Sequence, residues 1–185
     1  MLSKVITGSP GVGKHTISNR LAKRLNLKLI DINKVAIESG IFEQKNESLD
    51  VDVEKLKKVL AKKITKNSLV IGHLAPYVIL QKQVDTAVVL RKSPYKLASI
   101  YKKRKYSHEK SIQNLGSEIL GITLYDAISK FGADKTFQID TTNKSVSAVV
   151  KKIEGLFAKG VLEEGEVDWL GLISERNDIK RFFPY

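Results

Sequence analysis

The chain has 185 residues, 42% of them hydrophobic, which is enough for one sizeable core and too few for two large domains. Its 32 basic and 20 acidic residues give a net charge of +12, which favours polyanionic partners such as nucleotides or nucleic acid, with a generally basic surface as the alternative. The absence of cysteine excludes disulfides and thiolate metal sites, and no apolar run reaches the about 18 residues that can span a membrane.

Short apolar runs alternate with segments of helical periodicity, a pattern typical of a parallel sheet covered by helices. The N-terminus leads from "MLSK" directly into the first strand pattern, without the features of a signal peptide, so we expect a cytoplasmic protein. We expect strands at residues 4–8, 27–31, 68–72, 84–90 and 135–139. We expect helices at residues 14–25, 33–39, 50–65, 93–103, 108–130 and 145–158.

The composition changes near Gly160. Residues 1–160 read as a single domain, whereas residues 161–185 mix acidic side chains with aromatic ones such as Trp169 and Phe182. This last segment is too short for a core of its own. We therefore expect it to be a C-terminal tail packed on the body.

A phosphate-binding loop begins at residue 8. Gly8, Gly13 and Lys14 fit the spacing G-x-x-x-x-G-K, directly after an expected strand and directly before an expected helix, which is the context this motif requires. Glycines let successive backbone N–H groups face one centre, and a lysine here reaches the β- and γ-phosphates. The motif predicts an ATP site bound by Gly11, Val12, Gly13, Lys14, His15 and Thr16.

The residue after the lysine is unusual. His15 stands where many such loops place the Ser or Thr that holds Mg²⁺, and the next hydroxyl belongs to Thr16. Nucleoside monophosphate kinases commonly read G-K-G-T and also lack a hydroxyl directly after the lysine. Thr16 is the candidate metal ligand, with Mg²⁺ held largely by phosphates and water. A catalytic role for His15 and a plain exposed histidine both remain open.

Several segments together resemble the adenylate kinase isoenzyme 6 family, small P-loop proteins of archaea and eukaryotes that act in ribosome maturation. They are "TGSPGVGKHT", "LDVDVEKL", "VIGHLAP", "VVLRKSPYKL", "RKYSHEKSIQN" followed by "SEIL", and "IDTT". The resemblance covers residues 3–158. The loop alone is unspecific, but its combination with the other segments in this order is fairly specific.

The resemblance implies a nucleoside monophosphate kinase-like P-loop NTPase: a five-stranded parallel sheet flanked by helices, with monophosphate-binding helices at about 31–66 and a short lid at about 102–114. It implies Mg²⁺-dependent ATPase and weak adenylate kinase activity, in which ATP and AMP give two ADP. It also implies a role in small-subunit maturation through a ribosomal protein of the platform, with rRNA contact through the basic surface as a further expectation.

The resemblance also assigns residues. Arg104 matches the lid arginine, which would stabilise the transferring phosphoryl group, and Arg91 is a second cation that could support the transfer. His73 follows the third expected strand, where such folds place ligand groups, although a satisfied core histidine is the alternative. Lys14, Arg104 and His73 are thus the candidate catalytic residues. Tyr106, Lys110 and Asn114 match the lid pattern as well.

The chain departs from the family pattern at three places. Ile37 and Ile100 stand where arginines are common. At Ile37, AMP would lose a phosphate clamp, for which Lys34 on the same expected helix could substitute only as a point charge. No Asp precedes His73, where some relatives have one. These departures favour an ATPase acting in assembly over an efficient kinase. A metabolic small-molecule kinase remains the alternative.

Two further acidic positions each allow two interpretations. Asp31, at the end of an expected strand, could contact the nucleobase or a metal-bound water, or it could cap the following helix. Asp140, with Thr141 and Thr142, could shape the adenine-side loop or simply form a capping turn.

Overall fold

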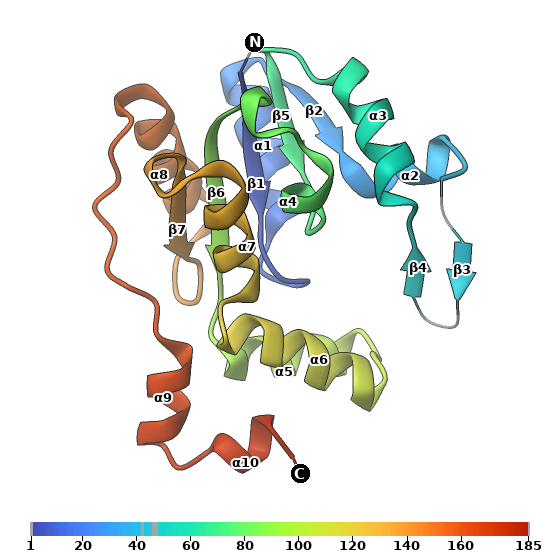
Figure 1. Ribbon diagram of the computed structural model, residues 1–185. Coiled ribbons are helices and arrows are strands. Elements are labelled where there is room, and N and C mark those ends of the chain that lie inside the picture. The colour runs from blue at the N-terminus through green and yellow to red at the C-terminus, as the bar shows by residue number, and fades with distance from the viewer. Residues whose placement is uncertain (1, 42, 46–47, 185) are drawn as a thin grey trace.

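Five parallel strands form the centre of the protein in the computed structural model, which describes residues 2–41, 43–45 and 48–184, without the side chains of residues 43–45 and 48–50 (Figure 1). Their order is β2-β5-β1-β6-β7, and every neighbouring pair is parallel. This sheet confirms the predicted fold class. The strands are β1 (Ser3–Thr7), β2 (Lys28–Asp31), β5 (Ser68–Ile71), β6 (Val84–Arg91) and β7 (Thr136–Asp140).

Helices follow the strands and cover both faces of the sheet. On one side lie α1 (Lys14–Leu25) and α8 (Val146–Lys159), while α5 (Pro94–Lys103) and α6 (His108–Ile119) lie beyond the carboxyl ends of the strands and share the same core (Figure 1). On the other lie α2 (Ile32–Glu38), α3 (Val53–Lys63), α4 (Ala75–Val78) and α7 (Ile122–Phe131). Short 3₁₀ turns at Gln81–Gln83 and Ala133–Lys135 precede β6 and β7.

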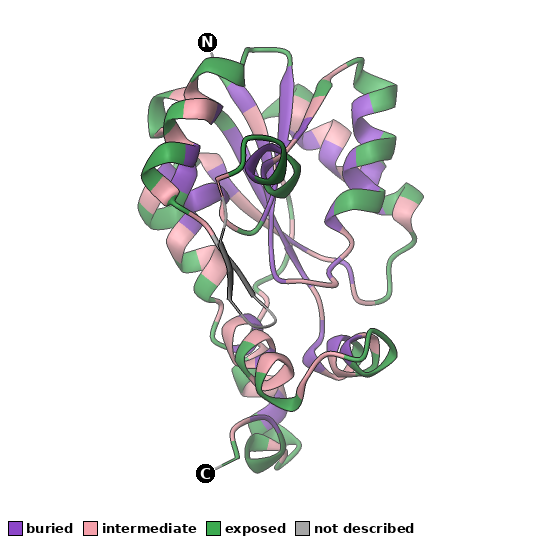
Figure 2. Ribbon diagram, turned by 90° about the vertical axis from the view of Figure 1, so that its right-hand side faces the viewer, coloured by how far each residue is buried: buried purple, intermediate pink, exposed green. Residues whose placement is uncertain are grey.

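Apolar side chains alternate between the two faces of the sheet, which explains why helices pack on both faces. In β1, Val5 belongs to the core on the α2, α3, α4 and α7 side, whereas Ile6 belongs to the core on the α1 and α8 side. Val70 and Ile71 of β5 divide between the two cores in the same way. Because successive side chains of a strand point to opposite faces, such continuous apolar runs make strands buried on both sides. Figure 2 shows the strands as the buried centre of the molecule.

The structure corrects three expectations about elements. The helix expected at 108–130 is two helices, α6 and α7, because Gly121 adopts a left-handed φ of 67° between them. The helix expected from residue 50 begins at Val53, with Asp52 as its N-cap, and residues 43–45 and 48–50 form an unexpected antiparallel pair, β3 and β4. Residues 42, 46 and 47, within the expected monophosphate-binding segment, lie outside the described residues.

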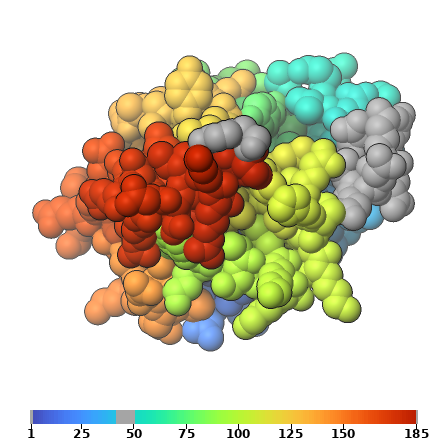
Figure 3. Space-filling view, turned by 90° about the horizontal axis from the view of Figure 1, so that it is seen from below, coloured from blue at the N-terminus to red at the C-terminus, as the bar shows by residue number. Residues whose placement is uncertain are grey.

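The C-terminal segment forms two short helices, α9 (Trp169–Glu175) and α10 (Ile179–Phe182), which pack against α6. Ile173 and Phe182 are buried in the same core as α1 and α8. In Figure 3 this segment, in red, lies against the yellow-green surface of α5 and α6. Within residues 2–41, 43–45 and 48–184, no helix combines the length and the apolar character needed to cross a lipid bilayer.

Candidate functional site

The loop from Gly8 to Gly13 joins β1 to α1 in a conformation that its glycines make possible. Gly8 has a φ of 135°, and a Cβ placed on it would lie 2.4 Å from the carbonyl oxygen of Leu90. Gly13, with a φ of 105°, is the N-cap of α1. Side chains are strained at such positive φ values, and at Gly8 a collision with backbone is added. The loop can therefore curl tightly ahead of the positive N-terminal end of α1.

Three side chains from other elements hold this loop in place. The Tyr101 hydroxyl of α5 donates to the carbonyl of Pro10 over 2.7 Å, and the Thr141 hydroxyl donates to the carbonyl of Val12 over 3.1 Å. From the loop itself, the Ser9 hydroxyl donates to the Glu118 carboxylate of α6 over 2.6 Å. Such bonds fix the loop backbone from outside.

Lys14 is the first residue of α1, and its side chain folds back onto the loop. Its ammonium donates to the carbonyl oxygens of Gly8 at 2.6 Å and Ser9 at 2.9 Å, and the residue is only 8% exposed. Burial lowers the pKa of Lys14 from 10.5 to about 8. The negative charges of Glu118 and Asp31 raise the pKa in part, whereas the positive charge of Arg104 lowers it further. A buried ammonium held only by carbonyl dipoles is an electrostatic site for an anion.

The first turn of α1 is linked to the start of α2. His15 Nε2 lies 2.7 Å from the Asp31 carboxylate, and both His15 and Thr16 are exposed. Asp31 also accepts from the backbone N–H of Asn33 at 3.0 Å, as the N-cap of α2. The structure thus supports the capping interpretation of Asp31 and gives His15 a carboxylate partner at the edge of the loop.

The expected lid at about 102–114 comprises the end of α5, a tight turn and the start of α6. Arg104 is the C-cap residue that follows α5. It is exposed, and its charge acts on Lys14. Tyr106 stacks on Tyr101 at 5.2 Å between ring centroids and carries the Lys110 ammonium 4.9 Å above its ring. These contacts give Tyr106 a packing role in the turn. Ile100 is partly buried and lies beside Gly11.

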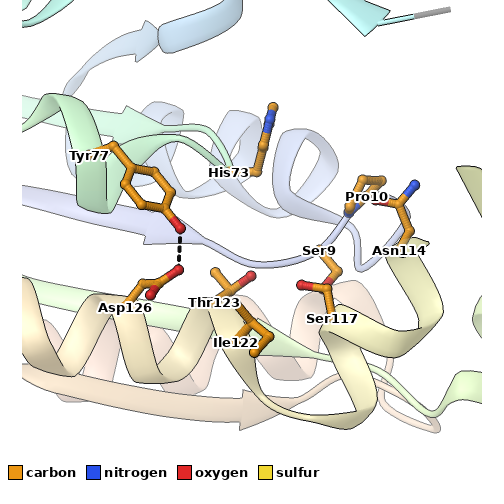
Figure 4. Close-up of a pocket in the computed structure, with 9 residues that line it drawn as sticks. All are labelled: Ser9, Pro10, His73, Tyr77, Asn114, Ser117, Ile122, Thr123 and Asp126. Atoms are coloured by element: carbon orange, nitrogen blue, oxygen red, sulfur yellow. Dashed lines mark hydrogen bonds between the residues drawn. The ribbon is translucent and has the colours of Figure 1, made fainter. Parts of the chain in front are cut away.

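A small pocket of about 120 Å³ adjoins the phosphate loop. Figure 4 shows its walls: Ser9 and Pro10 of the loop, His73 after β5, Tyr77 of α4, Asn114 and Ser117 of α6, and Ile122, Thr123 and Asp126 of α7. The Tyr77 hydroxyl donates to the Asp126 carboxylate, which raises the pKa of Tyr77 to about 12. The described lining residues include no Arg or Lys.

His73 is placed beside both the loop and this pocket. Desolvation of its ring, reinforced by the charge of Lys14, lowers the pKa of His73 below its usual value. The imidazole is therefore neutral at pH 7, and one nitrogen can accept a proton or a hydrogen bond. The structure thus brings Lys14 and His73 to one place, with the charge of Arg104 acting there as well.

The sequence did not single out the most connected residue of the site. Glu118 is 1% exposed and pairs with Arg91, whose Nε lies 2.9 Å from its carboxylate and which is itself 2% exposed. Arg91 is thus engaged in a buried ion pair. The only sequence signal was an acidic residue between the core-facing positions Leu115 and Ile119 of one helix.

Two other features near the loop are structural. Asp140 accepts from the backbone N–H of Thr142 at 2.8 Å and so forms the turn after β7, in line with the capping interpretation. In the part of the chain that the structure describes, no three His, Asp or Glu side chains come together as ligands for a metal ion.

The chain is similar to proteins of known families over most of its length. Residues 5–121 match the protein family described as AAA domain. Over 172 residues the chain is 34% identical to a "putative adenylate kinase" of Thermococcus kodakarensis, which covers 92% of this chain and 94% of the relative. A protein of the same name from Methanococcus maripaludis is 32% identical over 173 residues, covering 89% of this chain and 93% of the relative.

Solved structures share the fold at low sequence identity. A shikimate kinase from Bacteroides thetaiotaomicron is 16% identical, with a TM-score of 0.57 over 85% of this chain and 98% of the other. The YorR protein of Bacillus subtilis, solved with phosphorylated GDP, is 17% identical, with a TM-score of 0.60 over 84% of this chain and 95% of the other. At these identities the similarity concerns the fold alone.

Proposed function

Because the chain belongs to the AAA domain family and to the family of archaeal proteins named "putative adenylate kinase", we propose that it binds ATP with Mg²⁺ at the Gly8–Thr16 loop and transfers the terminal phosphoryl group, mainly to water and weakly to AMP. Within this family we assign it to the adenylate kinase isoenzyme 6 branch. The observation that carries the proposal is the buried ammonium of Lys14, held by two loop carbonyls ahead of a helix N-terminus.

The loop supplies binding and charge stabilisation. The backbone N–H groups of residues 11–16 would donate to phosphate oxygens, and the Lys14 ammonium would leave its two carbonyls to pair with them. Arg104, exposed and close enough for its charge to act on Lys14, would stabilise negative charge that develops during the transfer. Mg²⁺ neutralises phosphate charge when bound, and the exposed Thr16 hydroxyl in the first turn of α1 fits a ligand role.

The pocket beside the loop is the proposed acceptor site. Its walls supply hydroxyls and a neutral imidazole, so they suit an uncharged acceptor such as water better than the doubly charged phosphate of AMP. Neutral His73 could take or orient a proton of that acceptor. Ile37 is 51% exposed on α2, and Lys34 there pairs with Glu38 at 3.7 Å, so this helix offers AMP only a shared point charge. This favours ATPase over kinase turnover.

We further propose that the protein acts in maturation of the small ribosomal subunit by binding a ribosomal protein of the platform. The support is electrostatic: the net charge is +12, and Lys102, Lys103, Arg104 and Lys105 form an exposed basic run at the α5–α6 turn. A surface of this kind suits a site beside RNA.

ATP turnover by the purified protein with Mg²⁺ tests these proposals, measured alone, with AMP and with the platform protein. We expect slow turnover alone, a small gain with AMP and a clear change with the ribosomal protein. Turnover that persists in Lys14→Ala would refute the loop assignment. Strong stimulation by AMP, with two ADP per ATP consumed, would make the protein an efficient adenylate kinase. Turnover that instead needs one small hydroxylated metabolite would favour the alternative, a metabolic kinase.

A further inference from the structure

One buried carboxylate joins the C-terminal segment to the phosphate loop. The Glu118 carboxylate accepts the indole N–H of Trp169, the first residue of α9, at 3.1 Å. Its other oxygen accepts the hydroxyl of Ser9 at 2.6 Å. Ser9 and Trp169 are 160 positions apart in the chain, yet a single side chain that is 1% exposed holds both.

Glu118 accepts from four donors. Besides Ser9 and Trp169, it accepts Arg91 Nε at 2.9 Å and the backbone N–H of Lys92 at 3.0 Å. The donors from Arg91, Lys92 and Trp169 converge on Oε1, whereas Ser9 donates to Oε2. The arginine neutralises the buried charge, and the other donors fix its orientation. Loss of one donor would therefore change where the carboxylate holds the remaining ones.

The segment that carries Trp169 is anchored independently on the body. The Tyr95 hydroxyl of α5 donates to Asp178 at 2.7 Å, and the Tyr95 ring meets Phe182 edge-on at 5.2 Å. Lys144 and Lys152 of the body both pair with Glu164 in the stretch that leads to α9. Figure 1 shows this long connection from α8 down to α9. The position of Trp169 is thus set by contacts on both sides of it.

The same chain of contacts reaches the residue that would bind phosphate. Ser9 donates through its hydroxyl to Glu118, and its carbonyl accepts from Lys14 at 2.9 Å. We propose that Trp169 and Glu118 are positioning residues that hold Ser9, and through it the phosphate loop, in the form that binds ATP. This inference rests on the proposed ATP site. Since coupling is reciprocal, ATP that draws Lys14 away from Ser9 must also change the surroundings of Trp169.

The chain offers a direct optical test, because Trp169 is its single tryptophan. Addition of Mg·ATP to the wild-type protein should change the tryptophan emission in a saturable way. In Lys14→Ala the same titration should leave the emission unchanged. A wild-type emission that does not respond, at concentrations where calorimetry shows ATP bound, would overturn the inference.

Kinetics separate positioning from simple structural support. Trp169→Phe keeps an aromatic ring but removes the N–H. We expect it to raise the KM for ATP roughly three- to tenfold with kcat within about twofold, which is less than the full worth of one bond to a charged acceptor because only part of that bond's energy is transmitted to the loop. Glu118→Gln keeps the shape but removes the charge that neutralises buried Arg91 and replaces one acceptor oxygen with an N–H donor, so it should raise the KM for ATP more than Trp169→Phe does and also destabilise the protein. The control Tyr95→Phe loosens the segment at Asp178 without touching Glu118, and should keep the wild-type KM.

The outcomes separate this inference from the function on which it rests. If Lys14→Ala keeps ATP binding and turnover, the ATP site itself is wrong. If Lys14→Ala loses both while Trp169→Phe keeps the wild-type KM, only the positioning role is wrong. If Tyr95→Phe raises the KM as much as Trp169→Phe does, the effect is general loosening of the segment, and the specific role of the indole N–H is refuted.

Discussion

Replacement of Lys14 by methionine is expected to stabilise the nucleotide-free protein at neutral pH while it abolishes ATP binding. Lys14 is 8% exposed, and burial lowers its pKa from 10.5 to about 8. A shift of that size between the unfolded and folded chain corresponds to about 3 kcal/mol, the cost of keeping the ammonium in the loop. Methionine fills similar space without a charge, so we expect a gain of roughly 1–3 kcal/mol at pH 7.

The stability difference between wild type and Lys14→Met should depend on pH in a direction that the two pKa values of Lys14 determine. Below pH 8 both the folded and the unfolded chain keep the Lys14 proton, so the full cost applies. Between the folded pKa of about 8 and the unfolded value of 10.5, the unfolded chain binds more protons, so wild-type stability rises with pH relative to the variant. The advantage of Lys14→Met should shrink by about 2 kcal/mol between pH 7 and pH 9.5.

Urea unfolding of both proteins without nucleotide, at pH 7 and at pH 9.5, measures this difference. Titrations of other groups occur in both proteins and cancel in the comparison. The control Lys23→Met removes an exposed lysine from the same helix and should change the stability little at either pH. A constant difference between wild type and Lys14→Met at the two pH values would show that the ammonium is not held out of water, and would refute the reasoning.

Three further changes test other parts of the site. Gly8→Ala should lower the free energy of unfolding by roughly 3 kcal/mol or more, and the control Gly40→Ala by about 1 kcal/mol. Both glycines have a positive φ, but only a Cβ on Gly8 meets backbone atoms. Equal losses in urea unfolding would contradict this. Asp31→Ala should cost about 1–2 kcal/mol as a lost helix cap, whereas Asp31→Asn should cost less because its amide oxygen still caps; if the two variants unfold alike, the His15 pair matters more than the cap. Arg104→Ala should lower kcat roughly 10- to 1000-fold without a change in the free energy of unfolding. Lys102 is likewise exposed and lies in the last turn of α5, and Lys102→Ala should lower kcat less than about twofold. Similar steady-state rates for the two variants would exclude Arg104 from the phosphoryl transfer.

Much of the fold followed from local pattern. The five sheet strands lie within one residue of their expected positions. The central strands β1, β5 and β6 are apolar runs buried on both faces, and the edge strands β2 and β7 are short apolar segments bounded by polar residues. The split at Gly121 was missed because helical periodicity continues across residues 108–130, and only a positive φ interrupts it. The β3 and β4 pair was missed because each strand has only three residues and Leu49 is their only apolar one.

The candidate site was likewise predicted from the sequence only in part. The phosphate loop could be read from the sequence because its glycines and its lysine are neighbours in the chain. The contacts of Glu118 could not, because its partners Ser9 and Trp169 are 109 and 51 positions away. Periodicity places Glu118 on a helix between core residues, but only tertiary packing decides that it meets Arg91 and becomes a buried ion pair. The pocket, likewise, is assembled from four separate segments.

Hydrogen–deuterium exchange with and without Mg·ATP tests the central claim most directly, because it reports on the backbone N–H groups assigned to phosphate. We predict that saturating Mg·ATP slows exchange in peptides covering residues 8–16, and that Lys14→Ala shows no such protection at the same concentration. Binding of ATP with protection confined to other segments, or unchanged exchange at residues 8–16 in the wild-type protein, would contradict the assignment of this loop as the nucleotide site.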